Sequence, residues 1–157
     1  MDDELLDDAE AIAKADPSDV LRALATAGAQ VRAALARGSD AATPTWDGGR
    51  PRSVLVASLG GSAMVADVLA LLAGAGSPVP VTVRRGLPLP GWVGPLDLVV
   101  AVSLSGRAHG PLALAAEAGR RGAQLLTVGA PDSPLAVVCA QSRGVHVPVQ
   151  RPSEPGR

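Results

Sequence analysis

Residues 54–69 read VLVASLGGSAMVADVL, and residues 97–129 read DLVVAVSLSGRAHGPLALAAEAGRRGAQLLTVG. Each segment opens with an almost continuous apolar run, turns at a cluster of glycine and serine, and continues into a stretch rich in alanine and leucine. Strands that are apolar on both faces are typical of parallel sheets covered by helices. The two segments therefore predict strand, turn and helix units of an α/β fold.

Five apolar runs of strand length occur in the chain. They are residues 53–58, 79–84, 96–102, 123–128 and 145–149. Segments suited to crossover helices are residues 63–73, 112–121 and 135–141, whereas the link between the second and third strands, GLPLPG, is too rich in proline and glycine for a helix. We expect a three-layer α/β/α doubly wound sheet of five parallel strands in the flavodoxin-like order 2-1-3-4-5.

An amphipathic helix is expected ahead of the sheet, in residues 16–38, DPSDVLRALATAGAQVRAALARG. Asp16 and Ser18 are candidate caps, and Gly38 is a candidate stop. The apolar side chains that share one face are Val20, Leu21, Leu24, Val31 and Leu35. The expected organisation is amino-terminal helices and a linker in 1–52, the sheet domain in 53–150 and a carboxyl-terminal tail in 151–157.

Composition excludes several classes of protein. The chain has 157 residues, of which 47% are hydrophobic, which is enough for the core of one domain. Its 14 basic residues balance 15 acidic ones and only Trp46 and Trp92 are aromatic, so it lacks the charge and the stacking surface of a nucleic-acid binder. No apolar stretch is long enough to span a membrane, and the first residues are acidic, so we expect a soluble cytoplasmic protein. The single cysteine, Cys139, is expected to be a small buried group.

Two glycine- and serine-rich turns follow the first and third expected strands, between which the ligand crevice of this strand order opens. The first turn contains Gly60, Gly61 and Ser62; the second contains Ser103, Ser105, Gly106 and Arg107. Glycine lets the backbone approach a ligand closely, and amides at the start of a helix attract anions. Either turn alone is explained equally well as an ordinary strand end with a helix cap. Their expected convergence favours an anion site.

The two segments quoted first resemble the sugar isomerase (SIS) family, in particular the amino-terminal half of bifunctional phosphoglucose/phosphomannose isomerases. Residues 54–69 resemble that family's strand followed by G-x-G-G-S, and residues 97–129 resemble its phosphate-binding strand ending in S-x-S-G-[NE]-T-x-E. The linking VTVRRGLPLP, residues 81–90, is also similar, so the resemblance covers residues 54–149.

The resemblance implies roles for particular residues. Gly60, Gly61 and Ser62 would contact the sugar; Ser103 and Ser105 would bind its phosphate, next to Gly106, Arg107 and His109. Arg157, in the final PGR, matches the catalytic arginine of these isomerases. No metal or cofactor is implied.

The chain departs from the family pattern at three positions. Ser58 stands where the first motif has glycine, and Ala108 stands where the second has threonine, so one phosphate-binding hydroxyl is missing. His109 either supplies a donor in its place or is a solvated residue at a helix start. His146, in the last expected strand, is expected to be structural.

Isomerisation of a phosphosugar requires a ring-opening group, a base and a cation. In the resembled enzymes the base and the ring-opening histidine come from a second SIS subdomain. The acids outside the motifs, for which surface or capping roles are expected, are Asp67, Asp97, Glu117 and Asp132. We therefore expect this chain alone to be inactive.

The expected function is that of a phosphosugar-binding SIS domain of the glucose-6-phosphate/mannose-6-phosphate isomerase type, acting as a homodimer or paired with a second SIS subdomain. The alternative is a non-catalytic dimerisation or regulatory module, which the loss of a hydroxyl at Ala108 favours slightly. A dinucleotide enzyme is a third reading, because Arg84 and Arg85 follow the second strand, although the first turn does not fit G-x-G-x-x-G.

Overall fold

The computed structural model describes residues 7–40 and 49–149. The chain forms two compact units, residues 1–43 and 44–157. The first unit contains helices α1 (Ala9–Ala15) and α2 (Val20–Asp40). None of the described helices is long and apolar enough to cross a membrane.

Aspartates at the helix ends explain why the first unit has two helices. The carboxylate of Asp8 accepts hydrogen bonds from two amides in the first turn of α1. Asp16 ends α1, and its carboxylate accepts bonds from the amides of Val20 (2.9 Å) and Leu21 (2.8 Å), which confirms it as the cap of α2. The expected apolar stripe of α2 is exposed, and the helix continues to Asp40, beyond the expected stop.

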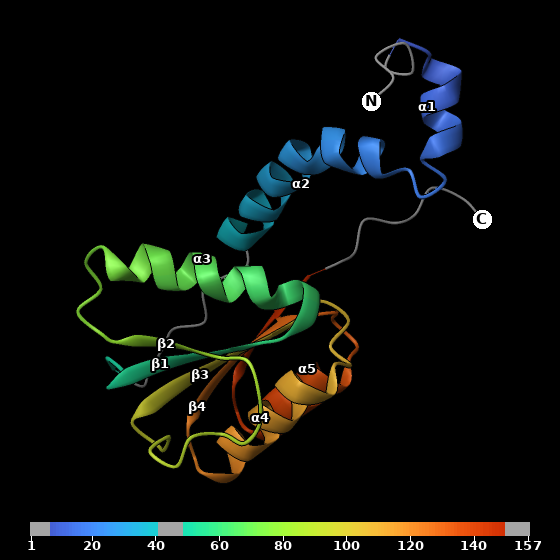
Figure 1. Ribbon diagram of the computed structural model, residues 1–157. Coiled ribbons are helices and arrows are strands. Elements are labelled where there is room, and N and C mark those ends of the chain that lie inside the picture. Colours follow the sequence, from blue (N-terminus) through green and yellow to red (C-terminus); the bar gives the residue numbers. More distant parts are fainter. Residues whose placement is uncertain (1–6, 41–48, 150–157) are drawn as a thin grey trace. The chain divides into compact units, whose positions relative to one another are not determined.

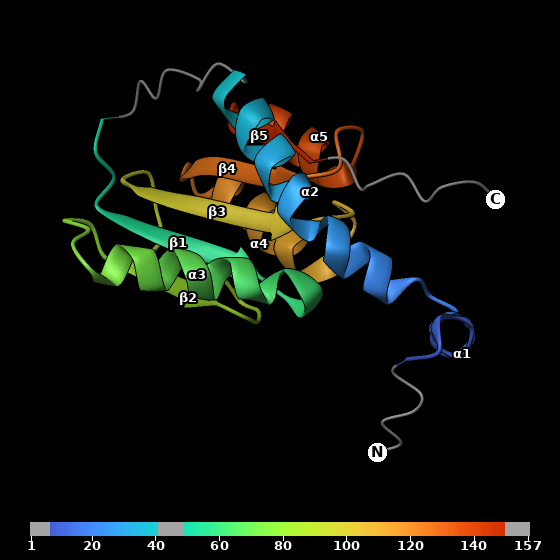
Figure 2. The ribbon, with the colours of Figure 1, turned by 90° about the horizontal axis from the view of Figure 1, so that it is seen from above.

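The second unit contains five parallel strands in the order β2-β1-β3-β4-β5, as expected. Their bounds are β1 (Ser53–Ser58), β2 (Val81–Arg84), β3 (Asp97–Ser103), β4 (Gln124–Gly129) and β5 (Val145–Pro148). Figure 2 shows β1, β3 and β4 lying side by side. Because all strands run the same way, their carboxyl ends meet at one edge of the sheet.

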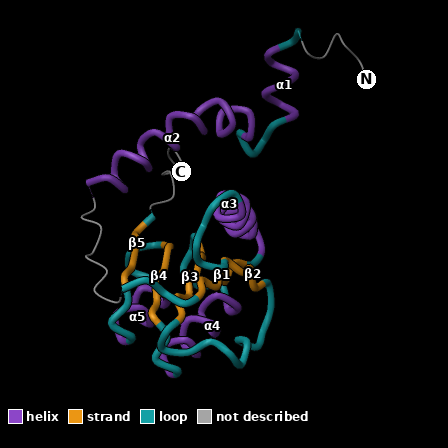
Figure 3. The backbone as a smooth tube through the Cα atoms, turned by 90° about the vertical axis from the view of Figure 1, so that its left-hand side faces the viewer, coloured by secondary structure: helices purple, strands orange, loops and turns teal. Residues whose placement is uncertain are grey.

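Helices cover both faces of this sheet. Helix α3 (Ala63–Gly74) lies on one face, and α4 (His109–Arg120) and α5 (Pro134–Gln141) lie on the other, as Figures 1 and 3 show. The expected three-layer α/β/α arrangement is therefore confirmed.

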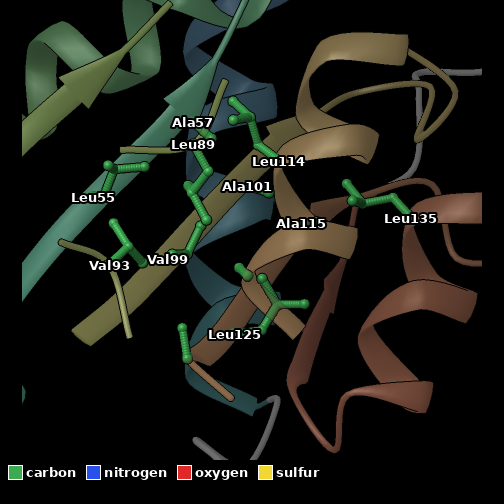
Figure 4. Close-up of a cluster of buried hydrophobic side chains, with 12 residues drawn as sticks. Leu55, Ala57, Leu89, Val93, Val99, Ala101, Leu114, Ala115, Leu125 and Leu135 are labelled. Carbon is green, nitrogen blue, oxygen red and sulfur yellow. The ribbon is translucent and has the colours of Figure 1, made fainter. Parts of the chain in front are cut away.

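Alternating side chains of the strands build two core clusters. On the side of α4 and α5, Leu114 and Leu135 pack with Val99 and Ala101 of β3 (Figure 4). On the opposite side, Ala66 of α3 packs against buried valines of β1 and β3. Burial on both faces explains why these strands are almost continuously apolar.

Prolines account for two boundaries that differ from the expectation. Strand β2 begins at Val81, after Pro80, which has no amide to give to the sheet; its carbonyl instead accepts a bond from Val54. Helix α4 begins at His109, three residues before the expected start. Pro111 lies in its first turn, where a missing amide costs nothing.

A buried ion pair ties the start of β3 to the chain ahead of β1. The guanidinium of Arg52 donates to both carboxylate oxygens of Asp97 (3.0 and 2.6 Å), and the Ser53 hydroxyl and the Gly94 amide donate to the same group. Burial raises the pKa of Asp97, but these hydrogen bonds outweigh it, so the pKa lies below its usual value. The expectation of a surface or capping role is wrong for Asp97, because its side chain is fully buried.

Candidate functional site

The turn after β1 opens toward solvent. Gly60 has a left-handed backbone (φ 64°), and a β-carbon on Gly60 or Gly61 would meet no atom within 4 Å. The hydroxyl of Ser58 donates to the carbonyl of Ser62 and closes the turn. Ser62 does not cap α3 with its side chain, so the cap that would explain this serine without a ligand is absent. A ligand has access to the backbone of this turn.

The turn after β3 presents two hydroxyls. Ser103 ends β3 and is buried, and Ser105 is partly exposed. The Ser103 Oγ accepts a long bond from the Ala108 amide (3.4 Å), and the Ser105 Oγ accepts one from the Arg107 amide (3.3 Å). Because both oxygens act as acceptors, each hydroxyl proton is left to donate to a ligand.

The start of α4 adds backbone amides to this second turn. Ala108 occupies the cap position in an extended conformation (φ −63°, ψ 125°) and supplies no capping side chain. Arg107 and His109 on either side of it are exposed. The uncapped start of a helix of 12 residues carries partial positive charge, and Arg107 adds a full one. His109 lies at the helix start, as expected, and no hydrogen bond fixes its ring among the described residues.

The two turns meet at the carboxyl edge of the sheet. Strands β1 and β3 are neighbours, with Ser58 in register with Val102. The side chain of Leu59 lies against Gly110 in α4, where a β-carbon would be 2.9 Å from a Leu59 methyl carbon. The structure therefore brings together the predicted site residues Gly60, Gly61, Ser62, Ser103, Ser105, Gly106, Arg107 and His109 at this edge. Arg157 lies outside the described residues.

A third loop, after β4, supports the serine turn and was missed by the sequence analysis. The Ala130 amide donates to the Leu104 carbonyl (3.1 Å), and the Leu135 amide donates to the Gly106 carbonyl (3.1 Å). A β-carbon on Gly106 would lie 2.1 Å from the Ser133 Oγ. Ser133 caps α5, and Pro134 follows it at the first helical position, a signature that the sequence contains.

Acidic side chains are tied up elsewhere. Asp67 on α3 pairs with Arg85, and Glu117 pairs with Arg120 and Arg121, whose hydrogen bonds lower the pKa of Glu117. Within residues 7–40 and 49–149, no group of three or more histidine, cysteine or acidic side chains is placed to hold a metal ion. The two turns themselves contain no carboxylate. Their chemistry is that of an anion-binding cradle.

His146 is structural, as expected. Its Nδ1 lies 2.7 Å from the Thr127 hydroxyl, and its Nε2 lies 3.3 Å from the Ala130 carbonyl. Nε2 donates to that carbonyl, so in the neutral ring Nδ1 accepts from Thr127. Cys139 is buried behind Thr127, and burial raises the pKa of its thiol.

Comparisons with known proteins place this geometry among sugar-phosphate folds. No family model matches the chain, and no curated protein matches it significantly. The sugar isomerase domain of an RpiR transcription factor from Sphaerobacter thermophilus is 25% identical with a TM-score of 0.50, over 57% of this chain and 52% of that one.

Two further solved structures share the fold. The protein c3406 of E. coli CFT073, in complex with arabinose 5-phosphate, is 19% identical with a TM-score of 0.63, over 88% of this chain and 78% of that one. The Vibrio vulnificus NanR protein, complexed with ManNAc-6P, is 18% identical with a TM-score of 0.55, over 90% and 56%. The chain spans about half the length of the first structures that it matches. Its structural neighbours are SIS-domain proteins of the phosphosugar-isomerase kind.

Proposed function

We propose that this chain is a SIS domain that binds a phosphorylated sugar. The phosphate binds at the turn after β3, and the sugar binds at the turn after β1. The observation that carries this proposal is the meeting of the two turns, in which Leu59 lies against Gly110 at the carboxyl edge of the sheet. Ligands bind in this crevice in open α/β sheets.

The phosphate is held mainly by neutral donors. The hydroxyls of Ser103 and Ser105 donate to its oxygens, and the amides at the start of α4 face it with the positive end of the helix dipole. Arg107 supplies a full positive charge, and His109 supplies a further donor when its ring turns toward the site. The open backbone of Gly60 and Gly61 lies next to the sugar.

The nearest ligand class is a sugar monophosphate such as glucose 6-phosphate or mannose 6-phosphate, as the motifs of the resembled isomerases suggest. Two structures with this fold were solved with arabinose 5-phosphate and with ManNAc-6P, which supports the phosphosugar class without selecting one sugar. We expect the chain to act in the cytoplasm, where such sugars are metabolised.

Aldose-ketose isomerisation belongs to the whole protein of this type. The two turns lack the acid and base that the reaction needs, so a second SIS subdomain or a second copy would supply them. An apolar surface for such pairing exists on α3, where Met64, Leu71 and Leu72 are exposed. We propose a homodimer; light scattering that gives only monomer at high concentration would contradict it.

A regulatory module is the second candidate. Ala108 removes a phosphate-binding hydroxyl of the catalytic family pattern, and one matching structure is the sugar isomerase domain of a transcription factor. A sensor of this kind binds a phosphosugar without turning it over, so it shares the ligand site but not the reaction.

Calorimetry tests the proposal. Glucose 6-phosphate, mannose 6-phosphate and fructose 6-phosphate are titrated against the chain, with glucose and inorganic phosphate as reference ligands. We expect a phosphosugar to bind more tightly than phosphate, and Ser105→Ala to lose about 1 kcal/mol or more of that binding, while Ser77→Ala, a serine at the far edge of the sheet, loses none. Binding of every ligand at the level of inorganic phosphate would refute specific recognition of a sugar.

A further inference from the structure

A second cation lies beside the proposed site, at the end of β2. Arg84 is the last residue of β2 and is in register with Ala57 of β1, one residue before the Ser58 that begins the first turn. Since β2 and β1 are parallel neighbours, Arg84 lies at the same carboxyl edge as the two turns. No motif of the sequence analysis assigns it a role in sugar binding.

Arg84 points to the side of the sheet on which α4 lies. Side chains alternate along a strand, and the neighbouring Val83 packs into the cluster on the α3 side. Ala57, the register partner of Arg84, belongs to the opposite cluster, which contains side chains of α4. Arg84 and the start of α4, which faces the proposed phosphate, therefore share one side of the sheet.

The guanidinium of Arg84 is oriented but not neutralised. Its Nε donates to the Gly86 carbonyl at 2.8 Å, which fixes the side chain against its own turn. Among the described residues, its two terminal nitrogens have no hydrogen-bond acceptor and no carboxylate partner. The adjacent Arg85, by contrast, is paired with Asp67.

An arginine with both terminal nitrogens available is suited to a planar anion. Its fork donates two parallel hydrogen bonds, the geometry that a carboxylate accepts. Two strand spacings, or about 9–10 Å, separate the ends of β2 and β3. A ligand with phosphate at the turn after β3 and a carbon chain across β1 therefore reaches Arg84 with its opposite end.

We propose that Arg84 binds a carboxylate at the end of the ligand opposite the phosphate, so that the site selects phosphorylated sugar acids over neutral phosphosugars. This inference rests on the proposed phosphosugar site and deepens it. A neutral aldose offers Arg84 only hydroxyl groups, whereas a sugar acid of equal length offers a charge that matches the guanidinium.

Two ligands of equal carbon number provide the test. Glucose 6-phosphate and 6-phosphogluconate share a six-carbon chain and a phosphate and differ in the group at the far end. By calorimetry with the full chain, we expect 6-phosphogluconate to bind about tenfold more tightly, and Arg84→Gln to abolish that preference while leaving glucose 6-phosphate unchanged. Arg84→Lys, which keeps the charge and loses the fork, should retain only part of the preference.

Matched variants separate this inference from the site itself. Arg85→Gln removes the neighbouring arginine and should leave the preference intact, whereas Ser105→Ala should weaken both ligands by the same factor. Equal binding of the two ligands by the parent chain, or a preference that survives Arg84→Gln, overturns the role of Arg84 and leaves the phosphosugar site standing. If neither ligand binds, the proposed function fails as well. Stabilisation of the parent by NADP but not by NAD, lost in Arg84→Gln, would overturn the inference by assigning Arg84 to a 2′-phosphate.

Discussion

The carbonyl oxygen of Ser103, at the end of β3, lies directly against the α-carbon of Gly129, at the end of β4. The two residues are in register, and a β-carbon on Gly129 would be only 2.3 Å from that oxygen. The obstacle is backbone and cannot rotate away. Gly129 thus allows the serine turn to sit where it does, and the proposed phosphate site depends on a residue that never touches the ligand.

Gly129→Ala is expected to displace the serine turn. The added methyl forces the strand ends apart, which should lower the free energy of unfolding by about 1–3 kcal/mol, the usual cost of overpacking. Phosphate binding should weaken in the same variant. Urea denaturation and calorimetry measure the two effects.

Gly76→Ala is the control for this substitution, because a β-carbon there meets nothing within 4 Å. It should leave both stability and binding close to the parent. If Gly129→Ala behaved like Gly76→Ala, the close approach of the two strand ends would not matter in solution.

Ala108→Thr should strengthen both the helix and the site. Ala108 already has the extended backbone of a cap, and a threonine hydroxyl there accepts from the Gly110 amide, since Pro111 has none. We expect about 1 kcal/mol of added stability and tighter phosphosugar binding, because the hydroxyl proton remains to donate to phosphate. Thermal unfolding and calorimetry provide the measurements.

The matched control is Ala108→Val, which has the shape of threonine and no hydroxyl. Tighter binding by the valine variant as well would show that the gain comes from shape and not from a hydrogen bond.

The buried Asp97 carboxylate predicts a pH dependence of stability. Its pKa is lowered in the folded chain, so its stabilising effect is present above the ordinary aspartate pKa of about 3.9 and is lost as pH falls through the lower, folded-state value. Asp97→Asn should cost about 2 kcal/mol near pH 7, the scale of hydrogen bonds to a buried charge. The difference from the parent should be level above about pH 5 and shrink below about pH 4.

Urea denaturation across this pH range measures the difference. Asp132→Asn, an exposed aspartate in the loop after β4, serves as the control and should change stability little at any pH. A cost of Asp97→Asn that stayed constant down to about pH 3 would mean that the carboxylate is not the group responsible.

The sheet was predictable because each strand carries its own signal. The apolar runs that are buried on both faces stand out from the alanine-rich helices, and the turns after β1 and β3 are marked by glycine and serine. The strand order then placed those turns together.

Contacts between distant residues were not predictable. Arg52 and Asp97 are 45 positions apart, and neither carries a local pattern that pairs them. Ser133 was readable as a helix cap, but its packing on Gly106 depends on how three loops meet. The free fork of Arg84 likewise follows from which neighbour took Asp67, which only the folded chain decides.

The 157-residue chain alone should not isomerise glucose 6-phosphate or mannose 6-phosphate. Its two turns contain no carboxylate, His146 is held by Thr127 and Ala130, and His109 is exposed. Ground-state binding of a phosphate lowers no chemical barrier. In a coupled assay with the Ser105→Ala variant as control for contaminating host enzyme, activity present in the parent and lost in the variant would show that catalytic groups exist in this chain.

The most direct test of the phosphosugar site is a crystal structure of the chain with glucose 6-phosphate. The phosphate is predicted to lie within hydrogen-bond distance of the Ser103 and Ser105 hydroxyls and of the amides that begin α4, with the sugar over Gly60 and Gly61. A ligand ordered only elsewhere, with the serine turn left in contact with solvent, would contradict the account.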